Sequence, residues 1–442
     1  MSAVRARDAE AVRDLLSRGA DPDAVDTVDA TGLPVLCVAV TAYDAQVAEA
    51  LVEGAADPDR VLPDGTTPLG RAVDGGSPAL FSAVLGKEPR LRLAEGARER
   101  LLALARDWYE TGAVEELRRR TGASGPAATV RVQDGEYDWV DQVTLGGRVV
   151  RAGHGAILTA LEWAFRVLTP VDELIARAVR QPDEEHVDWS TVCWILTERR
   201  SFETWSAVMA HRHSTDRAHR RFVVDYLRMR GFLDTGPYYE KKEGELLAAW
   251  AAEETDGEML AKVLDAFTNR DHPDQEAIGL RHADHPDPRV RREVPHALCA
   301  GYLPRTPAAR TALLTLIRDP DAEVQLRACT ASMRDGDLLP EITQALLLLA
   351  RAPDADVRGA ATVALAGSPD RTPAVADALA ASLGEENQFV RLEAAYGLAL
   401  RDDPRTAEAI ERVGPLGDGF EHDHRAYELS RWKWRKDNPA DE

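Results

Sequence analysis

Apolar residues recur with a helical period in the C-terminal third of the chain. Val357, Ala360, Ala361, Ala364 and Leu365 stand at positions i, i+3, i+4, i+7 and i+8, which places them along one face of an α-helix. Most of these residues are small, so a neighbouring helix can approach the apolar stripe closely. The pattern predicts a helix buried on one face.

This helix belongs to a tandem repeat. Each of four copies starts with an Asp or Asn, followed three residues later by a valine; the paired residues are Asp287 and Val290, Asp321 and Val324, Asp354 and Val357, and Asn387 and Val390. The valines are 34, 33 and 33 residues apart. Asp and Asn accept hydrogen bonds from the free N–H groups of a first helical turn, so each copy predicts a helix start at the same point. The near-constant period predicts a stacked helical array.

The four copies resemble HEAT repeats, in which the second helix of each pair begins with an acidic cap, then Val-Arg, then small residues. Arg291, Arg358 and Arg391 stand four residues after the cap. There an arginine can reach the preceding acid or an acid of the adjacent repeat and form a polar ladder; contact with a ligand is the alternative role. Gln325 interrupts this ladder in the second copy, and Pro295 is expected to kink or end the first helix.

A different repeat occupies the N-terminus. The segment Leu15–Asp23 recurs as Leu51–Asp59, with the glycines of the two copies 35 residues apart. Each glycine suits a left-handed helix C-cap, and the proline that follows prevents continuation of the helix. Thr67-Pro68-Leu69 suits an N-cap followed by the first helical position. These segments resemble ankyrin repeats, most closely up to about residue 75.

The segment between the repeats differs from both. Gly122–Gly155 combines glycine-rich turns with Val/Thr-rich stretches and predicts a connector with a β-hairpin. The following residues are helical in pattern and rich in tryptophan, and Leu246–Leu264 resembles a degenerate HEAT-type helix pair. We therefore predict an all-α fold, an α-solenoid in which an ankyrin-like array precedes a HEAT-like array. Its five parts are ankyrin-like repeats at 1–121, a connector at 122–155, a degenerate HEAT-like region at 156–270, HEAT-like repeats at 271–412 and a C-terminal cap and tail at 413–442.

Composition narrows the function classes. The 442 residues carry a formal net charge of −21. This charge disfavours binding to phosphate backbones and anionic membranes and favours binding to basic partners. The alternative explanation of the charge is that it only keeps the protein soluble. Neither an apolar run of spanning length nor a signal-peptide pattern is present, so we expect a cytoplasmic protein without membrane contact. The four cysteines are far apart and lack metal-binding or redox spacing, so we expect reduced core thiols: Cys37, Cys193, Cys299 and Cys329.

The sequence lacks the common motifs of catalysis and cofactor binding, including glycine-rich phosphate loops, nucleophile elbows and His-Glu-x-x-His. His211 and His213 are two residues apart, which places them on different faces of a helix, and no cysteine lies nearby. We expect no catalytic residue, no metal site and no cofactor.

Two basic segments interrupt the acidic chain. Between Arg199 and Arg230, eight arginines oppose three acidic residues. This segment could bind nucleic acid or an acidic partner, or it could be a solvated helix face that pairs with the acidic repeats. Its candidate contact residues are Arg212, Arg217, Arg220 and Arg221. The C-terminal segment Arg431–Lys436, with Trp432 and Trp434, is either a docking peptide or a segment that folds back onto the acidic array.

Stacked helical pairs expose continuous surfaces that suit binding. The ankyrin resemblance implies ligand contacts at the turn tips and first helices, which here are Asp26, Asp59, Arg60 and Leu62. We expect a non-enzymatic scaffold or adaptor that binds a basic protein; one concrete form is an immunity or antitoxin-like protein that covers a basic nuclease. The alternative is a HEAT-like nucleic-acid-binding protein that uses Arg199–Arg230. The sequence leaves the oligomeric state open.

Overall fold

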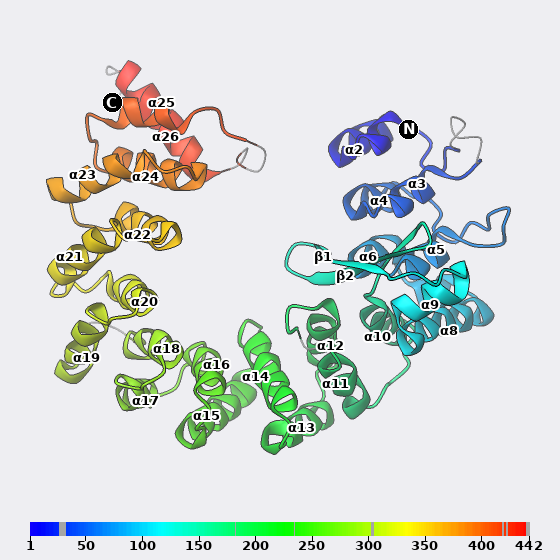
Figure 1. Cartoon of the computed structure of the whole chain (residues 1–442), viewed down its shortest axis with the longest axis horizontal. Coiled ribbons are helices and arrows are strands. Elements are labelled where there is room, and N and C mark those ends of the chain that lie inside the picture. The colour runs from blue at the N-terminus through cyan, green and yellow to red at the C-terminus, as the bar shows by residue number, and fades with distance from the viewer. Residues whose placement is uncertain are drawn as a thin grey trace. The chain divides into compact units, whose positions relative to one another are not determined.

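The structure is a computed structural model that describes residues 1–25, 32–181, 183–233, 235–301, 305–417, 420 and 423–438. Within these residues the chain is 65% helical, with 26 α-helices and a small three-stranded antiparallel sheet (Figure 1). It divides into two compact units, Met1–Met229 and Arg230–Glu442.

The first unit begins with short helices that pack in pairs, α3 on α4 and α5 on α6. The bounds are α1 (Ser2–Arg5), α2 (Ala9–Ser17), α3 (Val35–Thr41), α4 (Ala45–Glu53), α5 (Pro68–Gly75) and α6 (Pro78–Leu85). The predicted helix start at Thr67 is present: its hydroxyl accepts a hydrogen bond from Gly70 N at 3.0 Å, and Pro68 is the first helical residue. Leu36, Leu69 and Phe81 pack in the core between these helices.

The two repeated glycines play different roles. Gly19 is left-handed, with φ of +89°, as predicted for a C-cap. Gly54 is not left-handed: its φ is −75°, and Ala55 takes the positive φ of 72° instead. A Cβ on Gly54 would lie 2.6 Å from Leu16 Cδ1. A larger residue here would require the Leu16 side chain to move, because α2 packs closely against α4, which the repeat pattern does not reveal.

The predicted hairpin is part of a larger sheet. Strands β1 (Ala128–Gln133), β2 (Trp139–Leu145) and β3 (Arg148–Arg151) pair antiparallel in that order, and β2 turns into β3 through two left-handed glycines. Val143 and Val150 face each other across β2 and β3. They pack with Trp108 and Leu117 from α8 (Glu95–Thr111) and α9 (Ala113–Thr121). The connector is therefore docked on the helices of the first unit.

The first unit continues with helices that enclose a buried arginine. Their bounds are α10 (His154–Ala164), α11 (Val171–Val179), α12 (Val187–Glu198), α13 (Phe202–Ala210) and α14 (Arg217–Gly231), whose last residues belong to the second unit; a short α7 (Pro89–Arg92) precedes α8. Arg177 is 2% exposed and donates hydrogen bonds to Glu162 and Thr159 at 3.0 and 2.7 Å. This pairing joins α11 to α10. The sequence pattern predicts an apolar core here and does not predict a buried ion pair within it.

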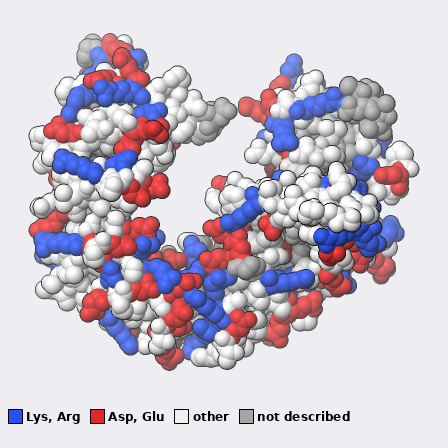
Figure 2. Space-filling view, in the orientation of Figure 1, with Lys and Arg blue, Asp and Glu red and all other residues white. Residues whose placement is uncertain are grey.

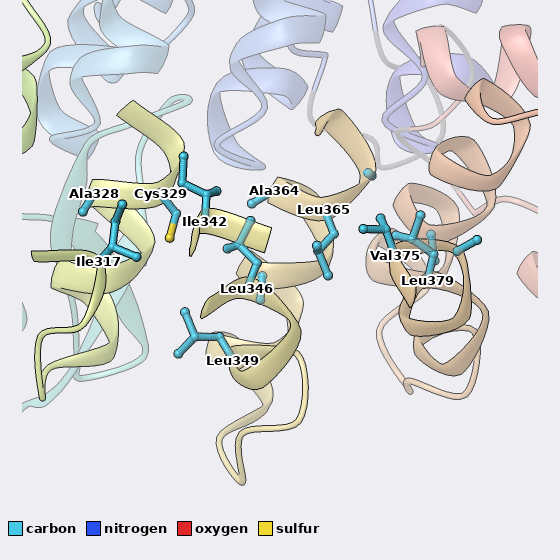
Figure 3. Packing of buried hydrophobic residues seen from close by; sticks show 14 of the residues in the cluster. Ile317, Ala328, Cys329, Ile342, Leu346, Leu349, Ala364, Leu365, Val375 and Leu379 are labelled. Atoms are coloured by element: carbon cyan, nitrogen blue, oxygen red, sulfur yellow. The ribbon is translucent and has the colours of Figure 1, made fainter. Parts of the chain in front are cut away.

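The second unit is a run of helix pairs. They are α15 (Pro237–Glu253) with α16 (Gly257–Thr268), α17 (Gln275–His282) with α18 (Pro288–Leu298), α19 (Pro307–Ile317) with α20 (Ala322–Ser332), α21 (Leu339–Leu349) with α22 (Ala355–Gly367), α23 (Pro373–Ser382) with α24 (Gln388–Leu400), and α25 (Thr406–Val413), followed by α26 (His424–Asp437). Ile342 and Leu346 of α21 pack near Leu365 and Leu379 in one continuous core (Figure 3). Pro295 does not end α18 at once: the helix continues through it and ends three residues later, at Leu298.

The cysteines are free thiols in the described residues. Cys37, Cys193 and Cys329 are buried and Cys299 is half-buried. Burial raises the pKa of Cys329 to about 12 and that of Cys299 to about 11. Separately, none of the described helices combines the length and the apolar character that crossing a bilayer requires.

Candidate interaction surface

Asp and Asn residues cap the second helices of the C-terminal pairs. Asp321 Oδ1 accepts hydrogen bonds from the backbone N–H groups two and three residues ahead, at 3.1 and 3.0 Å, and Asp354 Oδ1 does so at 2.9 and 3.1 Å. Asp287 and Asn387 each accept one such bond from the residue two ahead, both at 2.9 Å. The second helices therefore begin at equivalent points, which places the residues after each cap in register.

The arginines after these caps reach the next repeat. Arg291 donates through Nε and Nη2 to the Asp319 carboxylate at 2.7 and 2.8 Å, and Arg358 binds Glu385 in the same way at 2.8 and 3.0 Å. Each arginine also donates to the backbone carbonyls five and six residues before it. Asp319 and Glu385 stand two residues before the following cap, a position that the sequence analysis missed. Each guanidinium thus links the loop before its own helix to the loop before the second helix of the next repeat.

The carbonyl contacts persist where the ion pair is lost. Arg391 donates to the carbonyls six and five residues before it at 2.8 and 2.7 Å, and Gln325 Nε2 donates to the carbonyl six residues before it at 2.6 Å. Gln325 therefore interrupts only the ionic part of the ladder. Arg220 in α14 makes the same pair of contacts at 3.0 and 3.5 Å. This contact gives Arg220 a structural role equivalent to that of the ladder arginines.

Ion pairs cover the face between α18 and α20. Arg292 contacts Asp321 at 3.1 Å and also contacts Glu323, and Arg327 lies 3.8 Å from Glu293. Figure 2 shows acidic and basic side chains interspersed over the face in view. On α18 and α20, opposite charges thus neutralise one another across neighbouring helices.

The surface changes between α22 and α24, where it forms a groove. The cavity has a volume of about 650 Å³ and a floor of small side chains that includes Gly359 and Ala360. Val363 and Phe389, each 37% exposed, form its apolar walls. A Cβ on Gly359 would lie 3.1 Å from Val390 Cγ2, so the two helices approach closely beneath the groove. Together these small and apolar residues make this part of the groove apolar.

Carboxylates line the edge of this groove. Asp356, Glu385 and Glu386 oppose the single cation Arg358. The hydrogen bonds from Arg358 lower the pKa of Glu385, which neutralises that carboxylate within the ladder. Neither Asp356 nor Glu386 forms an ion pair with another residue in the described part of the chain. The groove therefore combines an apolar floor with two carboxylates that lack a cationic partner.

The period, the caps and the ladder together indicate a helical repeat. Residues 280–366 match the family model of HEAT repeats. No curated protein matches the chain. Among solved structures, it is similar to the X-ray structure of YibA from Escherichia coli, at 15% sequence identity and a TM-score of 0.42, over 60% of this chain and 97% of that one. The comparisons give no evidence for ankyrin repeats in residues 1–121.

Outside the HEAT-like array, the predicted N-terminal contact residues are held in turns. Asp59 pairs with Arg92, and Arg60 Nη1 donates to the Asp23 carbonyl at 3.3 Å. Leu62 is 4% exposed, and its backbone N–H closes the turn on the Thr66 carbonyl at 2.8 Å. The Leu62 side chain is therefore buried inside the turn. The expectation that it contacts a ligand is wrong. Asp26 lies outside the described residues.

The arginines of the basic segment contact the surrounding protein. The Arg221 guanidinium lies 4.7 Å from the centre of the Trp189 ring and 3.4 Å from Glu184. Arg230 pairs with Glu243 at 2.7 Å. Arg212 and Arg217 are not free of interactions either. These contacts favour the structural role of the segment over a role in binding nucleic acid.

The C-terminal segment folds back onto the HEAT-like array as α26. Trp432 is 7% exposed, and its Nε1 donates to Asp402 at 2.9 Å, where Lys436 also binds at 2.9 Å. Trp432 is therefore a core residue, which removes it from the predicted contact surface. Trp434 remains 53% exposed.

Two histidines of the first unit bind carboxylates. His211 and His219 stack with ring centres 5.2 Å apart, and each lies 2.9 Å from an aspartate, Asp172 and Asp216 respectively. In the part of the chain that the structure describes, no group of three or more His, Cys, Asp or Glu side chains is placed to hold a metal ion.

Proposed function

We propose that this protein is a non-enzymatic interaction protein and that the groove between α22 and α24 binds a basic segment of another protein. The observation that carries the proposal is the pair of carboxylates, Asp356 and Glu386, beside an apolar floor. A lysine or arginine side chain matches both features, because its aliphatic stem buries against apolar groups while its charged end reaches a carboxylate.

The charge of the chain supports this choice of partner. A net charge of −21 raises the rate of encounter with a basic protein. On α18 and α20 the acidic side chains are paired with arginines, whereas two carboxylates at the groove are not paired among the described residues. A protein that covers a basic nuclease, as immunity proteins and antitoxins do, is one form of this function. The nucleic-acid alternative is weaker, because Arg220, Arg221 and Arg230 bind groups of the protein itself.

We also propose that residues 1–121 are divergent ankyrin-like repeats. The cap at Thr67, the left-handed Gly19 and the packing of α3 with α4 and of α5 with α6 support this interpretation.

A charge reversal at the groove tests the function. The tagged protein would be captured from its own host after nuclease treatment, in parallel with Glu386→Lys and with Glu411→Lys, a control that reverses an exposed acid on α25 outside the groove. We expect a nuclease-resistant basic protein that the wild type and the control retain and that Glu386→Lys loses. Equal recovery by all three proteins would contradict the groove, and recovery of nucleic acid alone would contradict the function.

A further inference from the structure

A second cavity lies in the first unit, between the α10–α11 loop and α13. Its volume is about 520 Å³, and most of its lining is apolar: Trp163, Leu168, Pro170, Val171 and Ala207. Leu168 is 75% exposed, and the adjacent Val167, which does not line the cavity, is 43% exposed. Side chains of this type are normally buried, so the cavity and its edge expose apolar surface for which the fold provides no cover.

One cation, Arg199, lines this cavity. Its Nη2 donates to the Thr169 carbonyl at 2.8 Å, and its Nε is buried without a hydrogen-bond partner. Among the described residues, no carboxylate lies within ion-pair distance of Arg199. The nearby acid Glu162 instead binds Arg177 and Thr169, at 3.0 and 2.7 Å.

Other buried or partly buried arginines in this chain have more acceptors than Arg199, although the Nε atoms of Arg177 and Arg401 are also buried without a hydrogen-bond partner. Arg177 has two carboxylates, and Arg291 has the Asp319 carboxylate. Arg401 lacks a carboxylate but donates to five backbone carbonyls. Burial lowers the pKa of Arg199, so its charged form is poorly solvated where it stands. A half-buried guanidinium with one carbonyl acceptor can still bind an anion.

We propose that this cavity binds an apolar monocarboxylate, with the carboxylate on Arg199 and the apolar body against Trp163, Leu168 and Val171. Two acids that also line the cavity limit the charge that can enter. Asp172 is held by His211 at 2.9 Å, and Glu203 accepts a hydrogen bond from Ser201 at 2.7 Å. Their negative charges disfavour a dianion, so a single carboxylate on an apolar body fits best. Such a group is offered by a free small acid or by the C-terminus of a protein that ends in an apolar residue.

Calorimetric titration of the full chain with hexanoate, and with hexanamide as its uncharged counterpart, tests the site. We expect hexanoate to bind at least about tenfold more tightly than hexanamide, because only the carboxylate can pair with the guanidinium. Arg199→Gln should abolish this preference. Arg200→Gln, which removes the adjacent exposed arginine, should leave hexanoate affinity within about twofold of the wild type. Ala207→Phe, which keeps Arg199 and fills the cavity, should weaken both probes.

Equal binding of hexanoate and hexanamide, or loss of hexanoate binding in Arg200→Gln, would overturn the proposal. If Arg199→Gln does not fold, Ala207→Phe and the comparison of acid with amide in the wild type still decide the question. A peptide that ends in leucine, as its free acid and as its amide, separates the two sources of the ligand. Tighter binding of the peptide acid than of hexanoate points to a protein C-terminus, and the reverse points to a free acid.

Discussion

At the scale of single residues, the fold buries several arginine side chains. Removing a guanidinium from water costs several kcal/mol unless other groups replace its hydrogen bonds. Arg230 and Arg270 meet this requirement by sharing Glu243, which is fully buried, at 2.7 and 2.8 Å. Arg230 lies on α14, Glu243 on α15 and Arg270 in the loop after α16, so each pairing joins different segments of the chain. The acid that serves a given arginine therefore depends on how the helices stack, and the sequence alone does not reveal it.

Glu243→Gln should destabilise the protein strongly. The variant keeps the shape of the side chain but removes the charge between Arg230 and Arg270, so we expect a loss of about 3 kcal/mol or more in the free energy of unfolding. Glu245→Gln, two residues away on an exposed side chain, should change the stability by less than about 0.5 kcal/mol. Urea unfolding followed by tryptophan fluorescence measures both, and similar midpoints for the two variants would contradict the role of Glu243.

His154 should make stability depend on pH. It is buried against Trp108, with ring centres 4.7 Å apart, and burial lowers its pKa from 6.5 to about 4, although Asp74 opposes the shift. Below pH 6.5 the unfolded chain takes up a proton that the folded chain refuses, so stability should fall as the pH drops toward 4, by on the order of 3 kcal/mol. His154→Phe keeps the stack and should lack this component. Urea unfolding across this pH range checks it, and identical pH profiles for wild type and variant would exclude His154 as the cause.

At the scale of single elements, local signals were the most informative. The caps Asp287, Asp321 and Asp354 were predictable because a cap bonds to residues two or three positions ahead in its own helix. The ladder arginines were also predictable, but their partners were not, because Asp319 and Glu385 meet them only after the repeats have stacked. The same holds for the sheet. The sequence predicted a hairpin in this segment, but it did not predict that the sheet packs on α8 and α9.

The Arg358–Glu385 pair should contribute measurably to the stacking of α22 and α24. Both side chains are about a quarter exposed, so solvent weakens the pair, and we expect a coupling of about 1 kcal/mol in a double-mutant cycle of Arg358→Gln and Glu385→Gln. The glutamine that Arg358→Gln introduces can keep a carbonyl contact of the kind that Gln325 makes naturally. A coupling close to zero would mean that the bidentate contact does not stabilise the array.

Gly76 should be essential for docking of the sheet. It is left-handed, with φ of +73°, and a Cβ there would lie 1.8 Å from the Arg151 carbonyl. Gly76→Ala should therefore destabilise the first unit by more than about 2 kcal/mol, because the strain of a positive φ adds to the clash. Gly75→Ala, whose Cβ would meet only the Tyr43 ring at 3.4 Å, is the matched control. Thermal unfolding of the two variants at similar midpoints would argue against this close approach.

At the scale of the whole molecule, the repeat period and the charge were visible in the sequence, whereas the groove that we propose as the binding site was not. The HEAT-repeat match at residues 280–366 agrees with the array predicted from the spacing of the valines. The groove follows from a contrast between neighbouring repeats: ion pairs cover α18 and α20, while small residues and unpaired carboxylates lie between α22 and α24. Such a contrast emerges only when the exposed positions of adjacent helices are known.

Site-specific photo-crosslinking tests the central claim most directly. A photoreactive amino acid would replace Ala360, which lines the groove, and in a control protein Ala308, an exposed alanine on α19. After irradiation in the host, mass spectrometry would identify the crosslinked peptide. We predict an adduct at position 360 with a lysine- or arginine-rich segment of another protein and none at position 308. Crosslinks to nucleic acid, to acidic segments, or equally from both positions would contradict a groove that binds a basic partner.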